Sequence, residues 1–226
     1  MDFVDIDPNT GLMSIEALQL KLQQAELNGC LPKVLVPVHL TGASCDMLAI
    51  EMAKRYGFAV LEDASHAIGA SYRGETVGNC RYSNICVFSF HPVKIITIGE
   101  GGLATTNDPE LAIRMADLCS HGITKETERF KRPAPRSWSY EQQELGFNYR
   151  FTDFQADLDL SQLERLPQIV AERKRLWEVY SKLLASLPVG LLKIPADVLS
   201  ALHLAVIRLN VVDPALHCRV FEGLRA

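Results

Sequence analysis

The sequence predicts an α/β fold built on a mixed, mostly parallel β-sheet with helices on both of its faces. Two observations support this expectation. Short apolar runs alternate along the chain with segments whose apolar residues recur at helical spacing. Capping residues, glycines and prolines stand at the ends of those segments, where a strand or helix must stop. Strands that are separated by helices pair mainly in parallel, because the helix returns the chain to the same end of the sheet.

The first half of the chain shows this alternation most clearly. Ser14 and Asp46 are favoured N-cap residues in front of two helical patterns, and Gly57 ends the second one. Asn107-Asp108-Pro109 is a typical start for a third helix. Helices are therefore expected at 14–25, 46–56 and 109–119, and strands at 34–38, 58–61, 85–90 and 103–106.

The second half of the chain is less regular. Residues 121–148 are polar and rich in proline and aromatic side chains, which is typical of a long ordered loop with a functional role. Helical patterns follow at 155–166 and 168–187, and Pro167 between them is expected to break the helix. The charged run 172–175 is interpreted as a solvated helix face. A strand is expected at 204–209, and 220–224 are assigned to a further helix.

Composition and charge exclude several classes of protein. The 226 residues carry a net charge of −4, without the basic face of a nucleic-acid-binding protein. No apolar run approaches the roughly 18 residues that span a membrane. The first residues lack the basic start of a secretory signal. Six scattered cysteines without a Cys-x-x-Cys pair favour reduced thiols over a zinc site, so we expect a cytoplasmic protein.

Lys94 and Asp63 form the candidate catalytic pair. Lys94 lies between the apolar strand 85–90 and the tight turn 99–102, where an amine is poorly solvated. Poor solvation favours the neutral amine, which attacks carbonyl groups. Asp63 follows the strand 58–61, and ligands of such sheets bind at the carboxyl ends of the strands. Pyridoxal phosphate requires a Schiff-base lysine and a carboxylate that keeps its ring nitrogen protonated, so this cofactor is expected.

Other polar residues near the pair allow two interpretations each. The hydroxyl of Ser89 binds the cofactor phosphate or its own backbone, and Asp63 itself could simply cap the next turn. His66 contacts the cofactor ring or is a hydrogen-bonded core histidine. Gly101 and Gly102 permit a close backbone approach or form a plain turn.

Three segments resemble the DegT/DnrJ/EryC1/StrS family of sugar aminotransferases. They are Glu62-Asp63-Ala64-Ser65-His66-Ala67, Ser89-Phe90-His91-Pro92-Val93-Lys94 and Gly99-Glu100-Gly101-Gly102. The resemblance runs through most of residues 3–187 and implies the type I, aspartate aminotransferase-like fold. Residues 140–150 resemble the branch that aminates a UDP-linked 4-keto-6-deoxy-hexosamine in pseudaminic acid synthesis.

This resemblance implies a role for each candidate residue. Lys94 would form the Schiff base, Asp63 would hold the pyridine nitrogen, and His66 would lie at the ring or its 3-oxygen. Ser89 would bind the phosphate, and Asn148 would reach across a dimer interface to the phosphate of the other subunit. The family resemblance also implies a homodimer with shared active sites, L-glutamate as amino donor and a UDP-linked keto sugar as acceptor.

The chain departs from the family pattern in two respects. The family's N-terminal phosphate loop and ring-stacking aromatic residue are not found, so we expect a fragment. It would hold most of the cofactor-binding domain in 1–166, and the connecting helix and start of the small domain in 167–226. In addition, Asp157 and Asp159 replace small residues on a helix that is expected to pack. Burying unpaired carboxylates is costly, so that helix is expected to be destabilised or unusually exposed.

Three alternatives to a working aminotransferase follow from the sequence. The first is a truncated or binding-only relative that keeps the fold but not the catalysis. The second is a dehydratase of the same family, which the lysine at position 94 disfavours because those relatives generally have histidine there. The third is a metal-dependent hydrolase that uses His39, Asp63 and His66, although it leaves Lys94 unexplained.

Overall fold

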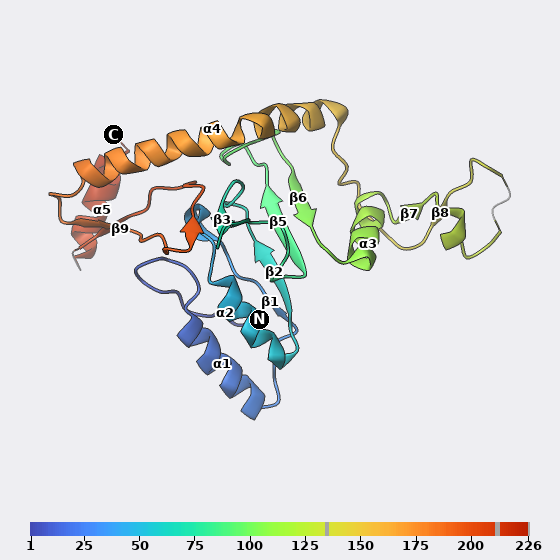
Figure 1. The fold of residues 1–226 in the computed structure, drawn as a ribbon, viewed down its shortest axis with the longest axis horizontal. Helices are drawn as coiled ribbons and strands as arrows, with labels where there is room; N and C mark the ends of the chain where they lie inside the picture. The colour runs from blue at the N-terminus through green and yellow to red at the C-terminus, as the bar shows by residue number, and fades with distance from the viewer. Residues whose placement is uncertain (134–135, 211–212, 226) are drawn as a thin grey trace.

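A four-stranded sheet forms the centre of the structure (Figure 1). The computed structural model describes residues 1–133, 136–210 and 213–225. The sheet order is β1-β2-β5-β6, with parallel pairs β1–β2 and β2–β5 and the antiparallel pair β5–β6. These strands are β1 (Val34–Leu35), β2 (Ala59–Asp63), β5 (Ile85–Ser89) and β6 (Gly102–Thr105). The expected mixed, mostly parallel sheet is confirmed, and β6 is antiparallel because no helix crosses over between it and β5.

One face of this sheet carries the hydrophobic core. Val60 of β2 and Cys86 and Phe88 of β5 are buried, whereas the alternating residues Leu61 and Val87 are only half-buried. The helices α1 (Ile15–Leu27) and α2 (Met47–Ala53) pack into the cluster that contains Val60. Glu62 pairs with Cys86 in the sheet register and points to this core face, so the neighbouring Asp63 points to the opposite face.

The long helix α4 (Asp153–Leu183) differs from the prediction. It begins with a capping box between Thr152 and Gln155 and continues through Pro167 without a break, so the expected division at Pro167 was wrong. Leu166 and Ile169, on either side of the proline, pack against the second core cluster. This packing holds the helix together although Pro167 cannot donate a backbone hydrogen bond. Figure 1 shows α4 running across the top of the fold.

Several predicted boundaries also move. The strand expected at 34–38 shortens to β1 with one isolated bridge from Val38 to Asp63, because Pro37 has no N–H to continue the ladder. The helix expected at 46–56 is α2 followed by the 3₁₀ turn η2 (Lys54–Tyr56), and α3 (Pro109–Cys119) begins at the expected cap Asp108. The strand expected at 204–209 is β11 (Ile207–Leu209), and the helix expected at 220–224 is the end of α5 (Pro214–Gly223).

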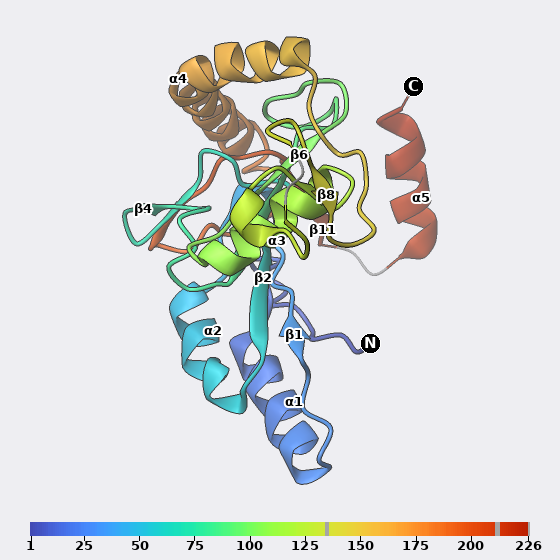
Figure 2. The same ribbon diagram turned by 90° about the vertical axis from the view of Figure 1, so that its right-hand side faces the viewer.

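The remaining elements are short and lie outside the central sheet. The region expected to be a loop contains the hairpin of β7 (Ile123–Thr124) with β8 (Glu141–Gln142) and the turn η3 (Thr127–Arg129). The other small elements are η1 (Leu40–Gly42), β3 (Ser71–Tyr72), β4 (Glu75–Thr76), β9 (Val189–Leu191) and β10 (Val198–Leu199). Figure 2, turned by 90°, shows α5 apart from α1 and α2. Among the described helices, none combines the length and apolar character needed to cross a membrane.

The two unusual aspartates of α4 have different environments. Asp157 is exposed, whereas Asp159 is buried and its Oδ1 has no hydrogen-bond partner among the described residues. Burial raises the pKa of Asp159. The expected cost of an unpaired carboxylate therefore applies to Asp159 and not to Asp157.

Replacing Asp159 should stabilise the protein in a pH-dependent way. We expect Asp159→Ala to increase the free energy of unfolding by about 1 kcal/mol near neutral pH, because it removes a buried group without a partner. Since the pKa of Asp159 is raised in the folded state, the penalty is present above the unfolded pKa and disappears below it. Urea unfolding near neutral pH and at about pH 3 measures both effects. Asp157→Ala is the matched control for helix propensity, and an equal gain in both variants would contradict the assignment.

Candidate active site

Asp63 is fixed at the carboxyl end of β2 by its backbone. Its N–H donates to the carbonyl of Pro37 at 2.9 Å, and its own carbonyl accepts from the N–H of His39 at 2.9 Å. The next residue, Ala64, donates to the carbonyl of Val87 at 2.8 Å, which ties the strand end to β5. The side chain is half-buried, and its Oδ1 accepts from the N–H of Ser65 at 3.0 Å. This carboxylate thus stands at the strand end, where a ligand is expected.

Lys94 is held in a turn that α4 secures. Its N–H donates to the carbonyl of His91 at 2.9 Å, and the following residues Ile95 and Ile96 are buried in the second core cluster. Gln162 of α4 exchanges two hydrogen bonds with the backbone of Thr97. Buried neighbours therefore fix the backbone of the lysine, while its side chain is half-buried.

Two histidines lie beside Lys94. The rings of His66 and His203 are 4.5 Å apart, and the Nδ1 atom of each is buried without a hydrogen-bond partner among the described residues. Burial lowers the pKa of His66, the charge of Lys94 lowers it further, and Asp63 partly opposes this. Burial, His66, Lys94 and Arg173 lower the pKa of His203 to about 4. The charge of Lys94 therefore disfavours protonation of both imidazoles, which pack against each other.

Ser89 and the glycine turn lie at the adjoining edge of β5. Ser89 pairs with Gly102 in the β5–β6 ladder, and its Oγ accepts a long 3.4 Å hydrogen bond from the N–H of His91. A Cβ on Gly102 would lie 2.7 Å from the carbonyl oxygen of Phe88, and one on Gly101 would lie 2.5 Å from Ile98 Cδ1. Gly102 is therefore needed for the close approach of β6 to the backbone of β5, whereas at Gly101 the nearest atom is the end of a side chain.

Asn148 lies in a different part of the chain from this group. It is exposed and forms an isolated antiparallel bridge with Ser120 at the end of α3. The rings on either side of it, Phe147 and Tyr149, stack 4.8 Å apart. Within the described ranges, no backbone hydrogen bond or isolated bridge joins Asn148 to Lys94 or Asp63 of the same chain.

Sequence reasoning missed His203 and Arg173. His203 follows β10 and arrives at the site through the tertiary fold, so its local sequence gives no signal. Arg173 lies in the charged run that was interpreted as a solvated face, yet it is half-buried. Its Nη1 donates to the carbonyls of Leu202 at 3.1 Å and His203 at 3.2 Å. That interpretation was therefore wrong for Arg173, which holds the loop that carries His203.

The structure does not support the metal-site alternative. His39 Nε2 lies 2.7 Å from Glu62 Oε2, and both groups are on the core face of the sheet, away from Asp63. Residues 1–133, 136–210 and 213–225 contain no group of three or more histidine, cysteine, aspartate or glutamate side chains arranged to hold a metal.

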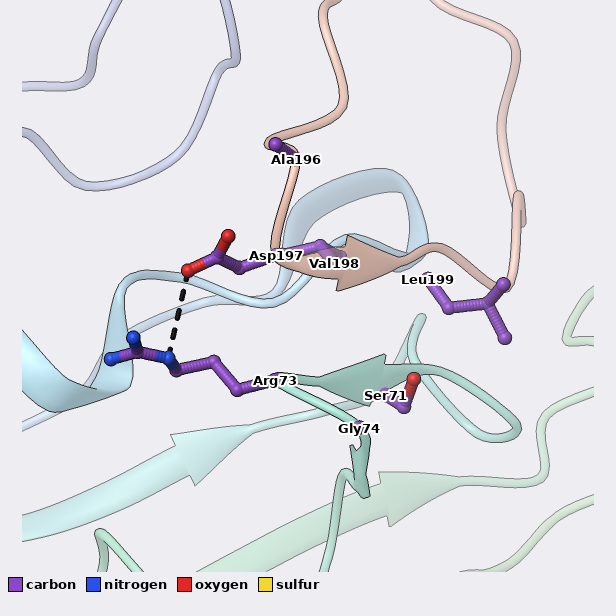
Figure 3. Close-up of a pocket in the computed structure, with 7 residues that line it drawn as sticks. All are labelled: Ser71, Arg73, Gly74, Ala196, Asp197, Val198 and Leu199. Carbon is purple, nitrogen blue, oxygen red and sulfur yellow. Dashed lines mark ion pairs between the residues drawn. The ribbon is translucent and has the colours of Figure 1, made fainter.

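A surface hollow of about 440 Å³ lies elsewhere, between the β3–β4 hairpin and β10 (Figure 3). An ion pair of 3.6 Å between Arg73 and Asp197 borders it. It is lined by Ser71, Arg73, Gly74, Ala196, Asp197, Val198 and Leu199. It contains none of the candidate residues, which lie at or after the carboxyl ends of β2 and β5 or in the segment of Asn148.

The chain belongs to the DegT/DnrJ/EryC1/StrS aminotransferase family, whose sequence model matches residues 2–218. The expected fold and family are thus confirmed. The uncharacterized protein MJ1066 of Methanocaldococcus jannaschii is 34% identical over 181 residues, which are 80% of this chain and 45% of that protein.

Solved structures of family proteins share the fold. PseC of Helicobacter pylori, an aminotransferase involved in the biosynthesis of pseudoaminic acid, has a TM-score of 0.82 at 28% identity. The match covers 99% of this chain and 56% of PseC. A putative sugar aminotransferase of Streptococcus pneumoniae in its PLP form has a TM-score of 0.81 at 26% identity, covering 98% of this chain and 58% of that one. The chain spans about half the length of the relatives it matches.

The packing of His203 against His66 predicts that the stability of the protein decreases in acid. His203 should titrate with a pKa of about 4 in the folded protein, below the ordinary value of 6.5. Because the unfolded chain binds this proton more readily, stability should fall as the pH decreases from about 6.5 toward 4. NMR titration of the imidazole signals measures the pKa, and the signal lost in His203→Gln assigns it. The stability of His203→Gln should depend less on pH in this interval. A titration midpoint of His203 near 6.5 in the wild-type protein would rule out the packed environment.

Proposed function

We propose that this chain is part of a pyridoxal-phosphate-dependent sugar aminotransferase. The observation that carries the proposal is the parallel pairing of β2 and β5, which puts Asp63 and the segments of His66 and Lys94 at the same edge of the sheet. The residues fit the cofactor: they supply a half-buried amine, a half-buried carboxylate and a buried imidazole nitrogen that lacks a partner among the described residues. Membership of an aminotransferase family supports the same function.

Each side chain has a distinct part in this proposal. When bound, pyridoxal phosphate supplies an aldehyde that takes up an amine and a ring that accepts electrons from the substrate carbon. Lys94 Nζ presents the amine and then moves a proton at the substrate carbon. Asp63, as a carboxylate, would accept a hydrogen bond from the protonated pyridine nitrogen and keep that nitrogen protonated, and the neutral His66 would lie at the ring. Ser89 donates its hydroxyl hydrogen to the phosphate.

The substrates and the assembly are proposed from the family resemblance. The acceptor is a UDP-linked 4-keto-6-deoxy-hexosamine aminated at C4, and the donor is L-glutamate. The similarity to PseC supports this acceptor class. Two copies would share their active sites, with Asn148 of one copy at the phosphate of the other. The exposed position of Asn148 is compatible with such a role.

Domain division and location complete the proposal. The cofactor-binding part comprises 1–166, and 167–226 comprise the connecting helix and the start of a smaller domain; α4 crosses this boundary unbroken. A cytoplasmic location is supported by the six free cysteines.

A second candidate is a chain that keeps the fold but transfers no amino group. This candidate and the first differ in turnover and not in fold.

Cofactor attachment tests the proposal. Purified chain mixed with pyridoxal phosphate should absorb in the visible range, and borohydride should fix the cofactor to Lys94 in a peptide found by mass spectrometry. Lys94→Ala should abolish the adduct, whereas Lys33→Ala, at an exposed lysine, should retain it. A folded wild-type chain without an adduct at Lys94 would refute the proposed function.

Addition of L-glutamate should convert the spectrum to the pyridoxamine form in a competent enzyme, and a stable adduct without this change would favour the second candidate.

A further inference from the structure

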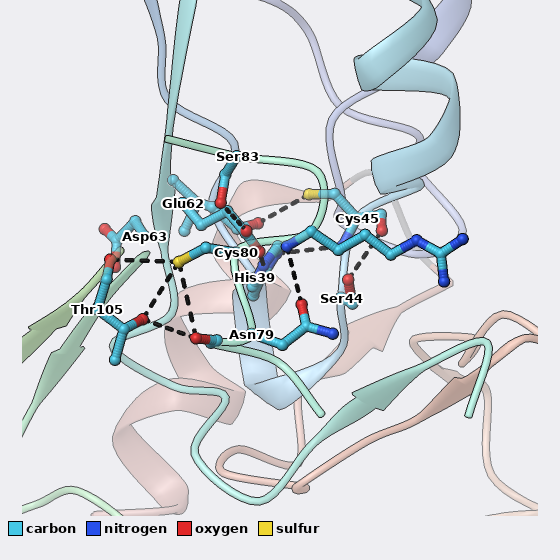
Figure 4. A network of polar contacts seen from close by, with 12 residues as sticks. His39, Ser44, Cys45, Glu62, Asp63, Asn79, Cys80, Ser83 and Thr105 are labelled. Atoms are coloured by element: carbon cyan, nitrogen blue, oxygen red, sulfur yellow. Dashed lines mark hydrogen bonds and ion pairs between the residues drawn. The ribbon is translucent and has the colours of Figure 1, made fainter. Parts of the chain in front are cut away.

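A buried polar network surrounds Glu62, the residue before Asp63, on the core face of the sheet (Figure 4). His39 Nε2 lies 2.7 Å from Glu62 Oε2, and the hydroxyl of Ser83 donates to Glu62 Oε1. The exposed fractions are 0% for His39, 5% for Glu62 and 8% for Ser83. Leaving a buried ionisable group unpaired is costly, so each member depends on the others. The three residues join the segment after β1, strand β2 and the segment before β5.

The order of the contacts excludes a nucleophilic triad. Both Ser83 and His39 contact the carboxylate of Glu62, so no imidazole is available to take a proton from the serine. All three side chains are also closed off from solvent. The network therefore has a role other than direct chemistry.

The protonation of His39 follows from its neighbours. The backbone N–H of Cys45 donates to His39 Nδ1 at 3.2 Å, which requires a lone pair on that nitrogen. If the His39 ring were doubly protonated, its Nδ1–H would face the N–H of Cys45, and neither group could accept a hydrogen bond. We therefore assign the neutral form with the hydrogen on Nε2, donated to Glu62.

Backbone hydrogen bonds connect this network to Asp63. The N–H of His39 donates to the carbonyl of Asp63 at 2.9 Å, and the N–H of Asp63 donates to the carbonyl of Pro37 at 2.9 Å. Glu62 immediately precedes Asp63, and successive strand residues point to opposite faces. Anchoring Glu62 on the core face therefore sets where the carboxylate of Asp63 stands on the other face.

The segment after His39 connects the network to His203. The carbonyl of Thr41 accepts from the N–H of His203 at 2.8 Å, and the carbonyl of Gly42 accepts from the N–H of Ala201 at 2.9 Å. Thr41 has a φ of 61°, a left-handed conformation that a threonine adopts only when its surroundings impose it. A Cβ on Gly42 would lie 2.9 Å from the carbonyl oxygen of His66. The segment from His39 to Gly42 therefore bonds to the backbone of Asp63 at one end and to the loop of His203 at the other.

We propose that the buried network of His39, Glu62 and Ser83 is a positioning device that sets Asp63 and the loop of His203 for the cofactor. The proposal rests on the proposed function for what those residues then do. All three side chains are buried, and Glu62, which both others contact, lies on the face opposite Asp63, so they are positioning residues. Their effect is on the placement of Asp63 relative to Lys94.

Hydrogen exchange on the chain without cofactor tests the positioning itself. Glu62→Gln removes the charge with little change in size, and the amides of His39 and Asp63 should then exchange about tenfold faster or more. Faster exchange should extend to Ala201 and His203. Asp117→Asn is the matched control, because it removes another buried carboxylate, paired with Arg129, that does not contact this network. It should leave exchange at these four amides at the wild-type rate.

Two further measurements make the outcome decisive. Ser83→Ala removes one hydrogen bond and keeps the His39–Glu62 contact, so it should accelerate amide exchange less than Glu62→Gln does. If Glu62→Gln does not fold, Ser83→Ala serves as the test variant. With added pyridoxal phosphate, the pH midpoint of the visible absorbance should shift in Glu62→Gln in the same direction as in Asp63→Asn and by less. Asp117→Asn should not shift it.

The results separate the two proposals. If neither Glu62→Gln nor Ser83→Ala speeds exchange at His39 and Asp63 beyond the control, the positioning role is wrong. If exchange accelerates as expected but the wild-type chain takes up no pyridoxal phosphate, the proposed function is wrong and the coupling of the network to Asp63 stands.

Discussion

The anchored end of β2 is the feature on which the rest of the site depends. Glu62 and Asp63 are neighbours in one strand, and the two-residue period of a strand sends their side chains to opposite faces. Glu62 is held in the core by His39 and Ser83, while the side chain of Asp63 points to the opposite face. A strand end without such an anchor would fray, because its last residues have few ladder partners. Here the partners come from both neighbouring strands.

Long-range contacts assemble the other parts of the site around this strand end. The turn of Lys94 is fastened to α4 by Gln162, and the loop of His203 is fastened to the same helix by Arg173. One long helix therefore secures two segments that are far apart in the sequence. This explains why α4 remains continuous through Pro167: its packing on the core cluster spans the proline. The stability of the helix and the geometry of the site share the same contacts.

The site also contains groups whose surroundings do not favour the charged form. His66 and His203 are packed against each other with unpartnered Nδ1 atoms among the described residues, and nearby positive charges disfavour their protonation. Polar atoms buried without partners are uncommon in protein interiors and often mark functional sites. The site face of the sheet supports the same interpretation, since Leu61 and Val87 are only half-buried there and the exposed Val34 lies on the same side. These features agree with a surface that serves ligand binding more than core packing.

The sequence by itself determined the class of fold, the strand ends at Asp63 and Ser89 and the family, because these depend on local periodicity and on short motifs. Helix caps at Ser14, Asp46 and Asp108 were also predictable, since a cap acts within one turn. Only the tertiary structure decided the continuity of α4, the burial of Asp159 and the roles of Arg173 and His203. Each of these depends on contacts between residues distant in the chain, which override local preference. The same holds for the contact of His39 with Glu62, because a buried hydrogen bond between two segments of the chain leaves no pattern in either segment alone.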